Sequence, residues 1–463
     1  MKRTLIASGI LMMLGAPAHA ADDLTAIRDE IRQMKATYEA RIQALEARLA
    51  QTERAAQQAD AKAEQTARAT MTPAQPATSR ANAYNPEIAL VLSGTYNYLQ
   101  RDPDTYQLTG FIPSGGEVEP GPRSFSLGES ELAISANIDP HFRGNLTVAL
   151  TPENEAEVEN AYIQTLALGN GLSIRAGRFF SGIGYMNEQH AHTWDFTDAA
   201  LPYKAFLGNQ YADDGVQVKW LAPSEDLLVE LGAEIGRGRS FPAAERNKNG
   251  SIAGTAFVHV GGDVGVSSSW RAGLSYLGSR PKERGYDDAD ALGNPTSNSF
   301  SGKSRTWIAD FVWKWAPNGN AKETNLKLQG EYFRRSEDGT LACAGLSELG
   351  SCGAGISDSY QATQSGWYVQ GVYQFMPYWR AGLRHDRLDS GTPQLGAGLN
   401  LADFAVLTPY NARRNTLMVD YSPSEFSRIR LQYARDEARM GIADNQFALQ
   451  YIMSLGAHGA HKF

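Results

Sequence analysis

Apolar and polar residues alternate along most of the chain after residue 86. In "TWIADFVWKW", Trp307 and Phe311 fall on one face of an extended segment, while Asp310 falls on the other. The same split recurs over residues 326–332 and 417–421. A period of two residues indicates β-strands whose two faces meet different surroundings.

The composition of the apolar face distinguishes between two kinds of β protein. A soluble β-sandwich also alternates, but its outward face would be the polar one. Here the apolar face carries several tryptophans and tyrosines of the kind that lie at membrane interfaces, which favours a transmembrane β-barrel. After the N-terminal leader no run of about 18 apolar residues remains, so a helical membrane protein is excluded.

The spacing of the strands predicts an all-β fold, a transmembrane antiparallel β-barrel of about sixteen strands over residues 86–463. Short turns such as "NIDPH" and "SPSEF" alternate with long loops, as expected when short turns face the periplasm and long loops the exterior. The long loops are predicted at 181–212, 280–302, 338–361 and 389–412. The predicted strands begin near residues 88, 124, 142, 157, 171, 214, 226, 252, 269, 304, 324, 363, 378, 414, 427 and 445.

Three shorter regions precede the barrel. Residues 1–20 have the charged start, apolar run and small-residue cleavage pattern of a signal peptide, which predicts export. Residues 21–70 predict a periplasmic α-helical coiled coil, because an apolar seam with one stutter runs through residues 24–63. A single solvated helix is the alternative. The proline-containing residues 71–85 predict a linker.

The formal charge of the chain is -8. Because a basic stripe is the expected footprint of a nucleic-acid-binding protein, this balance argues against nucleic acid as a partner. The partners expected instead are outer-membrane lipid, small hydrophilic solutes and, through the helical seam, two further copies of the chain in a homotrimer.

Two stretches resemble known outer-membrane proteins. The terminal strand "NQFALQYIMSLGAHGAHKF" ends in an aromatic residue, Phe463, and resembles the sorting signal of bacterial outer-membrane proteins. "VENAYIQTLALGNGLSIRAGRFF" resembles the fourth and fifth strands of phosphate-selective porins, within the sixteen-stranded porin group. A coiled coil before the barrel is similar to sucrose-type porins and to a TonB-independent siderophore receptor family. The resemblance implies the outer membrane of a Gram-negative bacterium.

The third long loop contains the most suggestive stretch, "MNEQHAHTWDFTDAA" at residues 186–200. In porins this loop folds into the lumen, so the resemblance implies a pore constriction. The residues predicted to form it are Glu188, His190, His192, Asp195 and Asp198. Phosphate-selective porins place basic residues along their anion path, so an acidic loop argues against phosphate as the solute.

Arginines are predicted on the wall opposite the loop. Strand parity places Arg380, Arg384, Arg428 and Arg430 in the lumen. An acidic loop facing these arginines would set up a transverse field, and charged rings of this kind set ion preference. In the alternative interpretation the arginines only hydrogen-bond lumenal carboxylates and hold the wall together.

Other candidate chemistry is weaker. His190 and His192 could bind Zn, Cu, Ni or Fe, but a closed site needs four ligands, so hydrogen-bonded loop histidines are favoured and no metal or cofactor is predicted. Glu153, Glu155, Glu157 and Glu159 predict an acidic ladder at the mouth or a solvated rim. Without a G-x-S-x-G or a comparable arrangement, no catalytic residue and no enzyme activity are predicted.

Cys343 and Cys352 are the only cysteines, and both fall in one predicted external loop. An oxidising compartment predicts a disulfide between them.

These observations favour a passive outer-membrane channel for small hydrophilic solutes or ions. One alternative is a TonB-independent uptake receptor for a specific ligand, such as a metal chelate or siderophore. The other is a structural protein that tethers the envelope.

Overall fold

The computed structural model describes residues 86–456, apart from residues 116–117, 153–154, 225, 245–246, 346–349 and 354. The chain divides into two units, and the second, Ala83–Phe463, contains all of the described residues. The predicted signal peptide, coiled-coil helix and linker lie outside the described residues, as do the C-terminal histidines and Phe463. No helix within the described ranges is long and apolar enough to cross a membrane.

Nineteen strand segments form one sheet. They are β1 (Glu87–Leu99), β2 (Ser124–Leu127), β3 (Ser130–Asn137), β4 (Phe142–Leu150), β5 (Ala156–Thr165), β6 (Leu172–Phe180), β7 (Ala212–Leu221), β8 (Leu228–Gly236), β9 (Ala253–Val264), β10 (Ser268–Ser279), β11 (Arg284–Ala289), β12 (Pro295–Trp315), β13 (Asn325–Gly345), β14 (Ile356–Met376), β15 (Trp379–Asp389), β16 (Gln394–Leu395), β17 (Arg413–Ser424), β18 (Ser427–Glu437) and β19 (Asp444–Gly456). Short helices in the connections are η1 (Pro103–Thr105), η2 (Ala191–Thr193), α3 (Leu201–Leu207), η3 (Pro317–Gly319), η4 (Leu401–Asp403) and η5 (Ala405–Leu407).

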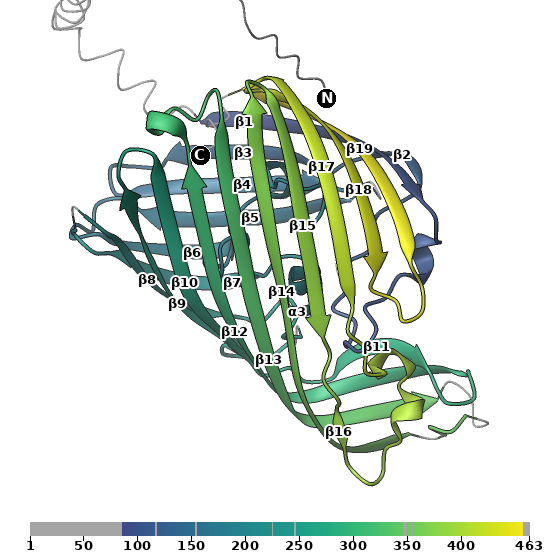
Figure 1. Cartoon of the computed structure of the whole chain (residues 1–463). Coiled ribbons are helices and arrows are strands. Elements are labelled where there is room, and N and C mark those ends of the chain that lie inside the picture. The colour runs from purple at the N-terminus through teal and green to yellow at the C-terminus, as the bar shows by residue number, and fades with distance from the viewer. Residues whose placement is uncertain are drawn as a thin grey trace, which may run out of the picture. The chain divides into compact units, whose positions relative to one another are not determined.

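The sheet closes into an antiparallel barrel of sixteen strands (Figure 1). The first and last strands pair with each other, with Tyr96 opposite Leu449. The nineteen segments occupy sixteen positions in the described chain, because β2 and β3 share one partner strand, as do β10 and β11, and β15 and β16. Closure leaves no edge of unpaired backbone groups, which is what a sheet needs in lipid. The predicted fold class is therefore confirmed.

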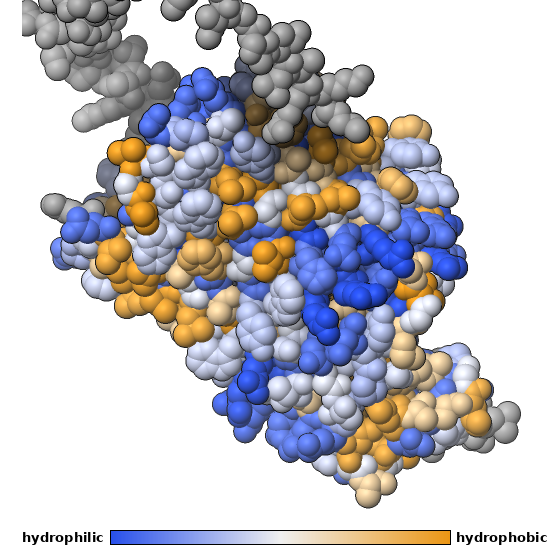
Figure 2. All heavy atoms as spheres, in the orientation of Figure 1, coloured by the Kyte–Doolittle hydropathy of each residue, from blue (hydrophilic) through white to orange (hydrophobic). Residues whose placement is uncertain are grey.

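Alternation separates the two faces of the wall as predicted. On β12, the outward Trp307 and Phe311 are 50% and 49% exposed, whereas the inward Ile308, Asp310 and Val312 are buried. Figure 2 shows apolar and weakly polar residues over the upper wall on one face, with strongly hydrophilic residues gathered across the middle and toward the lower part. The outward apolar residues are suited to lipid contact.

Three long strands continue past the barrel. β12, β13 and β14 have 21 residues each and form, with β11 and β16, an extension beyond the rim (Figure 1). The prediction that residues 280–302 and 338–361 are mainly loop was therefore wrong. In "PTSNSFS" of β12 the outward positions are Pro295 and three serines. Strands outside lipid need no apolar face, so the alternation on which the prediction depended is absent there.

A separate apolar core stabilises this extension. Phe300, Leu341 and Tyr360 from the strands pack with Phe404 and Val406 of the loop that follows β16. Cys343 and Cys352 belong to the same core and are joined by a disulfide, with their Cα atoms 5.7 Å apart.

The first prediction concerns this disulfide. Alkylation of the unreduced protein should leave Cys343 and Cys352 unmodified, and mass spectrometry should detect their linked peptides, because both sulfurs are buried in one core. Cys343→Ser with Cys352→Ser should speed proteolysis of residues 338–361, since a short loop loses its covalent closure. The barrel itself should keep its heat-modifiable migration in detergent gels. Two freely alkylated thiols in the unreduced protein would contradict the prediction.

Candidate functional site

Residues 181–211, here called the inner loop, connect β6 to β7 and fold inside the barrel. Asn187 ties the two ends of the loop together: its amide nitrogen donates to the carbonyl oxygens of Ser181 and Tyr211 at 2.8 and 2.9 Å. The Tyr211 N–H donates in return to Asn187 Oδ1 at 2.8 Å. The loop is therefore closed at its base before it crosses the lumen.

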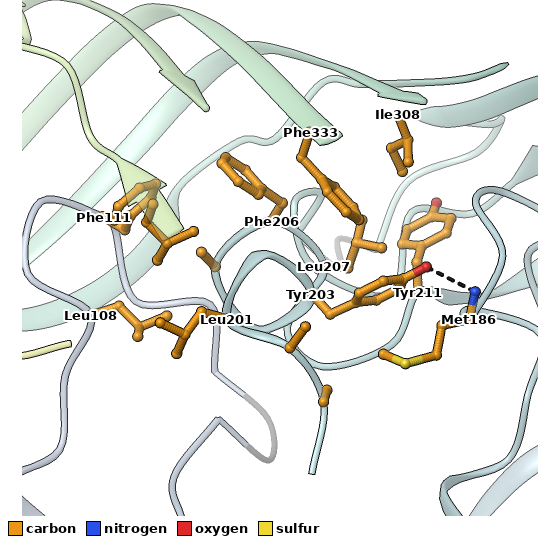
Figure 3. Close-up of a cluster of buried hydrophobic side chains, with 14 of the residues drawn as sticks. Leu108, Phe111, Met186, Leu201, Tyr203, Phe206, Leu207, Tyr211, Ile308 and Phe333 are labelled. Carbon is orange, nitrogen blue, oxygen red and sulfur yellow. Dashed lines mark hydrogen bonds between the residues drawn. The ribbon is translucent and has the colours of Figure 1, made fainter. Parts of the chain in front are cut away.

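The apolar side of the inner loop packs on the strands that follow α3 in sequence. Every residue of α3 is buried. Phe206 stacks on Phe333 of β13, with ring centroids 5.8 Å apart and an interplanar angle of 7°, and Phe111 from the first loop meets Phe206 edge-on at 5.6 Å. Figure 3 shows these rings with Leu201, Leu207 and Tyr211 in one cluster. Part of the lumen is thus filled by apolar side chains.

A buried carboxylate orients the start of the loop. Glu331 of β13 accepts hydrogen bonds from the hydroxyls of Tyr203 and Tyr368 at 2.9 and 2.6 Å. It also accepts from the backbone N–H of Tyr185 at 3.0 Å. The Tyr203 hydroxyl lies 3.2 Å from the Met186 nitrogen, the contact drawn in Figure 3. Strand β13 therefore fixes both α3 and the residues that lead to the histidines.

Two of the predicted acidic residues contact the arginine wall directly. Asp195 forms ion pairs with Lys327 and with Arg380 at 3.1 Å. Asp198 forms ion pairs with Arg384 at 3.0 Å and with Arg414. Burial alone would raise the pKa of both carboxyls, but the adjacent cations outweigh it and hold each pKa well below its usual range.

Arg428 and Arg430 hold the loop through its backbone. Arg430 donates to the Trp194 carbonyl oxygen at 2.7 Å, and Arg428 donates to the same oxygen at 3.3 Å. The four predicted wall arginines therefore all touch the inner loop. The predicted field across a water-filled gap is replaced by direct pairing, which is the alternative that the sequence left open.

Glu188 lies apart from the other two acidic residues. It pairs with Lys219 of β7 at 2.9 Å and faces Arg175 of β6 at 3.6 Å. The loop thus carries ion pairs to opposite parts of the wall. Sequence reasoning missed Lys327, Arg414, Arg175 and Lys219, although inward strand parity marks each of them.

The two histidines meet glutamates on another part of the wall. His190 Nδ1 lies 2.8 Å from a Glu159 oxygen and 3.0 Å from a Glu131 oxygen, and His192 Nδ1 lies 2.6 Å from the other Glu131 oxygen. Burial disfavours the charged imidazole, but the hydrogen bonds to the two glutamates outweigh it and raise the pKa of His190 to about 10. Sequence reasoning placed Glu159 in an acidic ladder and did not identify Glu131.

A cavity of about 1620 Å³ lies beneath the inner loop. Its lining includes Glu188, His190, His192 and Asp195 of the loop and residues of the short turns between strands, such as Gly265 and Phe426. The cavity therefore extends from the inner loop toward the rim formed by the short turns.

Comparison with known proteins supports the fold. No protein-family model matches the chain. An uncharacterized protein of Aquifex aeolicus (strain VF5) is 28% identical over 407 residues, which cover 82% of this chain and 80% of that protein. The solved structure of OmpT lacking loop L8, an outer membrane protein of Vibrio cholerae, is 11% identical with a TM-score of 0.51, covering 81% of this chain and all of that one. The outer membrane channel DcaP of Acinetobacter baumannii is 12% identical with a TM-score of 0.45, covering 81% of this chain and 98% of that one.

The similarity to OmpT, at 11% identity, concerns the fold and not an activity. The chain is a closed sixteen-stranded antiparallel barrel with a long loop folded into its interior.

The second prediction tests the ion-pair anchors of the loop. Asp198→Asn leaves Arg384 and Arg414 without their shared carboxylate, which costs on the order of 3 kcal/mol. Amides of residues 195–207 should then exchange hydrogen faster in mass spectrometry, while the barrel strands keep their protection. Glu188→Gln is the matched control, since Glu188 is more exposed and should change exchange little. Equal protection of the loop in both variants would show that Asp198 does not anchor it.

Proposed function

We propose that this protein is an outer-membrane channel of the porin type for small hydrophilic solutes or ions. The observation that carries the proposal is the barrel whose outward residues are apolar and whose charged inner wall encloses a loop and a large cavity. A wall that is apolar outside and polar inside suits a water-filled channel through a lipid bilayer. In this proposal the inner loop is the constriction.

The ion pairs bear on selectivity. Asp195 and Asp198 are compensated by cations in contact with them, so the loop does not act as a bare acidic ring. Glu188 lines the cavity and is the most exposed of the three acids. We therefore expect a modest ion preference that depends on the balance of these pairs.

The second candidate function, uptake of a specific ligand, is favoured by the apolar packing around α3. Phe206, Phe333 and Phe111 fill part of the lumen, which suits a channel that admits few solutes. The two candidates can be separated by measuring the flux of neutral sugars of increasing size into liposomes that contain the protein. A general channel should admit these sugars in order of size alone.

The apolar seam at residues 24–63 supports a trimer with a periplasmic helix.

The third prediction tests the constriction. Replacing residues 188–206 with a short glycine-serine linker should raise single-channel conductance in planar bilayers several-fold, because the loop and its apolar packing no longer occupy the lumen. The control replaces residues 397–404 in the extension with a linker of equal length, and its conductance should match the unmodified protein. A loop-replaced barrel that conducts no better than the original would refute the constriction.

The fourth prediction concerns ion preference. Asp195→Asn with Asp198→Asn removes the two loop carboxylates that face Arg380, Arg384 and Arg414, so the reversal potential in a KCl gradient should move toward the chloride potential. Arg380→Gln with Arg384→Gln should move it the opposite way. Arg435→Gln is the control, because Arg435 is exposed and pairs with Glu437 away from the inner loop. Shifts of the same sign in both double variants would be incompatible with ion pairs at the constriction.

A further inference from the structure

Four potential metal ligands converge at one end of the inner loop. Glu131 comes from β3, Glu159 from β5, and His190 and His192 from the loop on either side of Ala191. One ligand atom from each of Glu131, Glu159 and His190 lies within 4.8 Å of the others. His192 is not part of that group, but its Nδ1 contacts the other Glu131 oxygen at 2.6 Å. Three segments far apart in sequence therefore supply two carboxylates and two imidazoles.

The partners of these carboxylates differ from those of the other loop ion pairs. Asp195 and Asp198 bind arginine and lysine side chains, whose protonated nitrogens offer no lone pair to a metal. Within the described residues, the ion pairs of Glu131 and Glu159 are made with histidine alone. An imidazole can exchange its proton for a metal ion, so this is the part of the loop where a cation can replace a proton between the same groups.

Charge and accessibility agree with such an exchange. Once His190 has released its proton to an incoming metal, two glutamates with two neutral imidazoles carry two negative charges, which one divalent cation balances. Glu131, His190 and His192 line the cavity of about 1620 Å³ that extends to the short-turn rim, so an ion can reach them. The Asn160 amide nitrogen contacts His190 Nε2 at 3.1 Å and helps to fix the position of the ring.

We propose that Glu131, Glu159, His190 and His192 form a binding site for a divalent first-row transition-metal ion such as Zn²⁺. The mixed nitrogen and oxygen ligands favour such an ion over Mg²⁺ or Ca²⁺, which prefer oxygen alone. Tetrahedral zinc with bonds near 2.1 Å places its ligand atoms about 3.4 Å apart. Three histidine–glutamate separations are 2.6 to 3.0 Å. Because His192 lies outside the 4.8 Å group, its ring must rotate to join the other three ligands.

The site departs from the expectation drawn from the sequence, in which the two histidines lacked further ligands. The two glutamates that complete the set lie 61 and 31 residues before the histidines they contact. The proposal does not depend on the barrel being a channel, because binding is measured on the protein in detergent. Its failure and that of the proposed function can therefore be told apart.

The test is calorimetric titration of ZnCl₂ into the tag-free full chain purified in detergent. His458→Ala and His461→Ala are introduced throughout, because those two histidines offer an alternative site. We expect about one ion bound per chain, with affinity at least about tenfold weaker in Glu159→Gln and in His190→Gln, since even outer-shell changes cost 10- to 100-fold. Heat-modifiable migration confirms that each variant is folded.

The matched control is His259→Gln. His259 is also a buried histidine paired with a glutamate, Glu230, at 2.9 Å, and Asp310 lies near it without forming an ion pair with it in the described structure. Zinc binding should be unchanged in this variant. The proposal is overturned if the folded protein binds no zinc, if Glu159→Gln and His190→Gln both bind as tightly as the parent, or if His259→Gln weakens binding equally.

Discussion

The pairing of Asp198 with Arg384 and Arg414 is the interaction on which the arrangement of the lumen depends. A charge taken out of water is costly unless a partner meets it. Here the Asp198 carboxylate meets both arginines, which pair on the wall with Asp386 and Asp436 as well. The arginines come from β15 and β17, whereas the carboxylate comes from the loop after β6. Electrostatics thus joins two distant parts of the barrel and fixes the loop that α3 packs against the wall.

Much of the barrel could be predicted from the sequence, because lipid outside and a filled lumen inside impose strict alternation on every strand. The positions of Trp307 and Phe311 in the sequence predicted that both side chains face outward, and both are exposed in the structure. The extension could not be predicted in the same way. Beyond the membrane the outward residues of β12 are Pro295 and three serines, so no apolar face separates strand from loop, and 21-residue strands were interpreted as shorter ones.

The candidate site was predicted in part. Residues 186–200 and the four wall arginines contact one another in the structure. This part could be predicted because strand parity and loop length are local properties of the sequence. Their pairing could not be obtained, because it depends on which strands lie opposite one another across the lumen. Glu131 illustrates the limit: nothing near it in sequence relates it to His192, yet the two side chains touch at 2.6 Å.

The inner loop thus holds two kinds of ionic contact with different chemistry. On the β15–β18 side, guanidinium groups stay protonated and hold Asp195 and Asp198 in place without offering a ligand to any cation. On the β3–β5 side, imidazoles hold Glu131 and Glu159 through protons that a metal ion can replace. A loop with one permanent anchor and one exchangeable contact can change its charge at the cavity without leaving the lumen. Under the two proposals made above, occupancy of the metal site would therefore change the charge of the inner loop while Asp195 and Asp198 keep the loop in place.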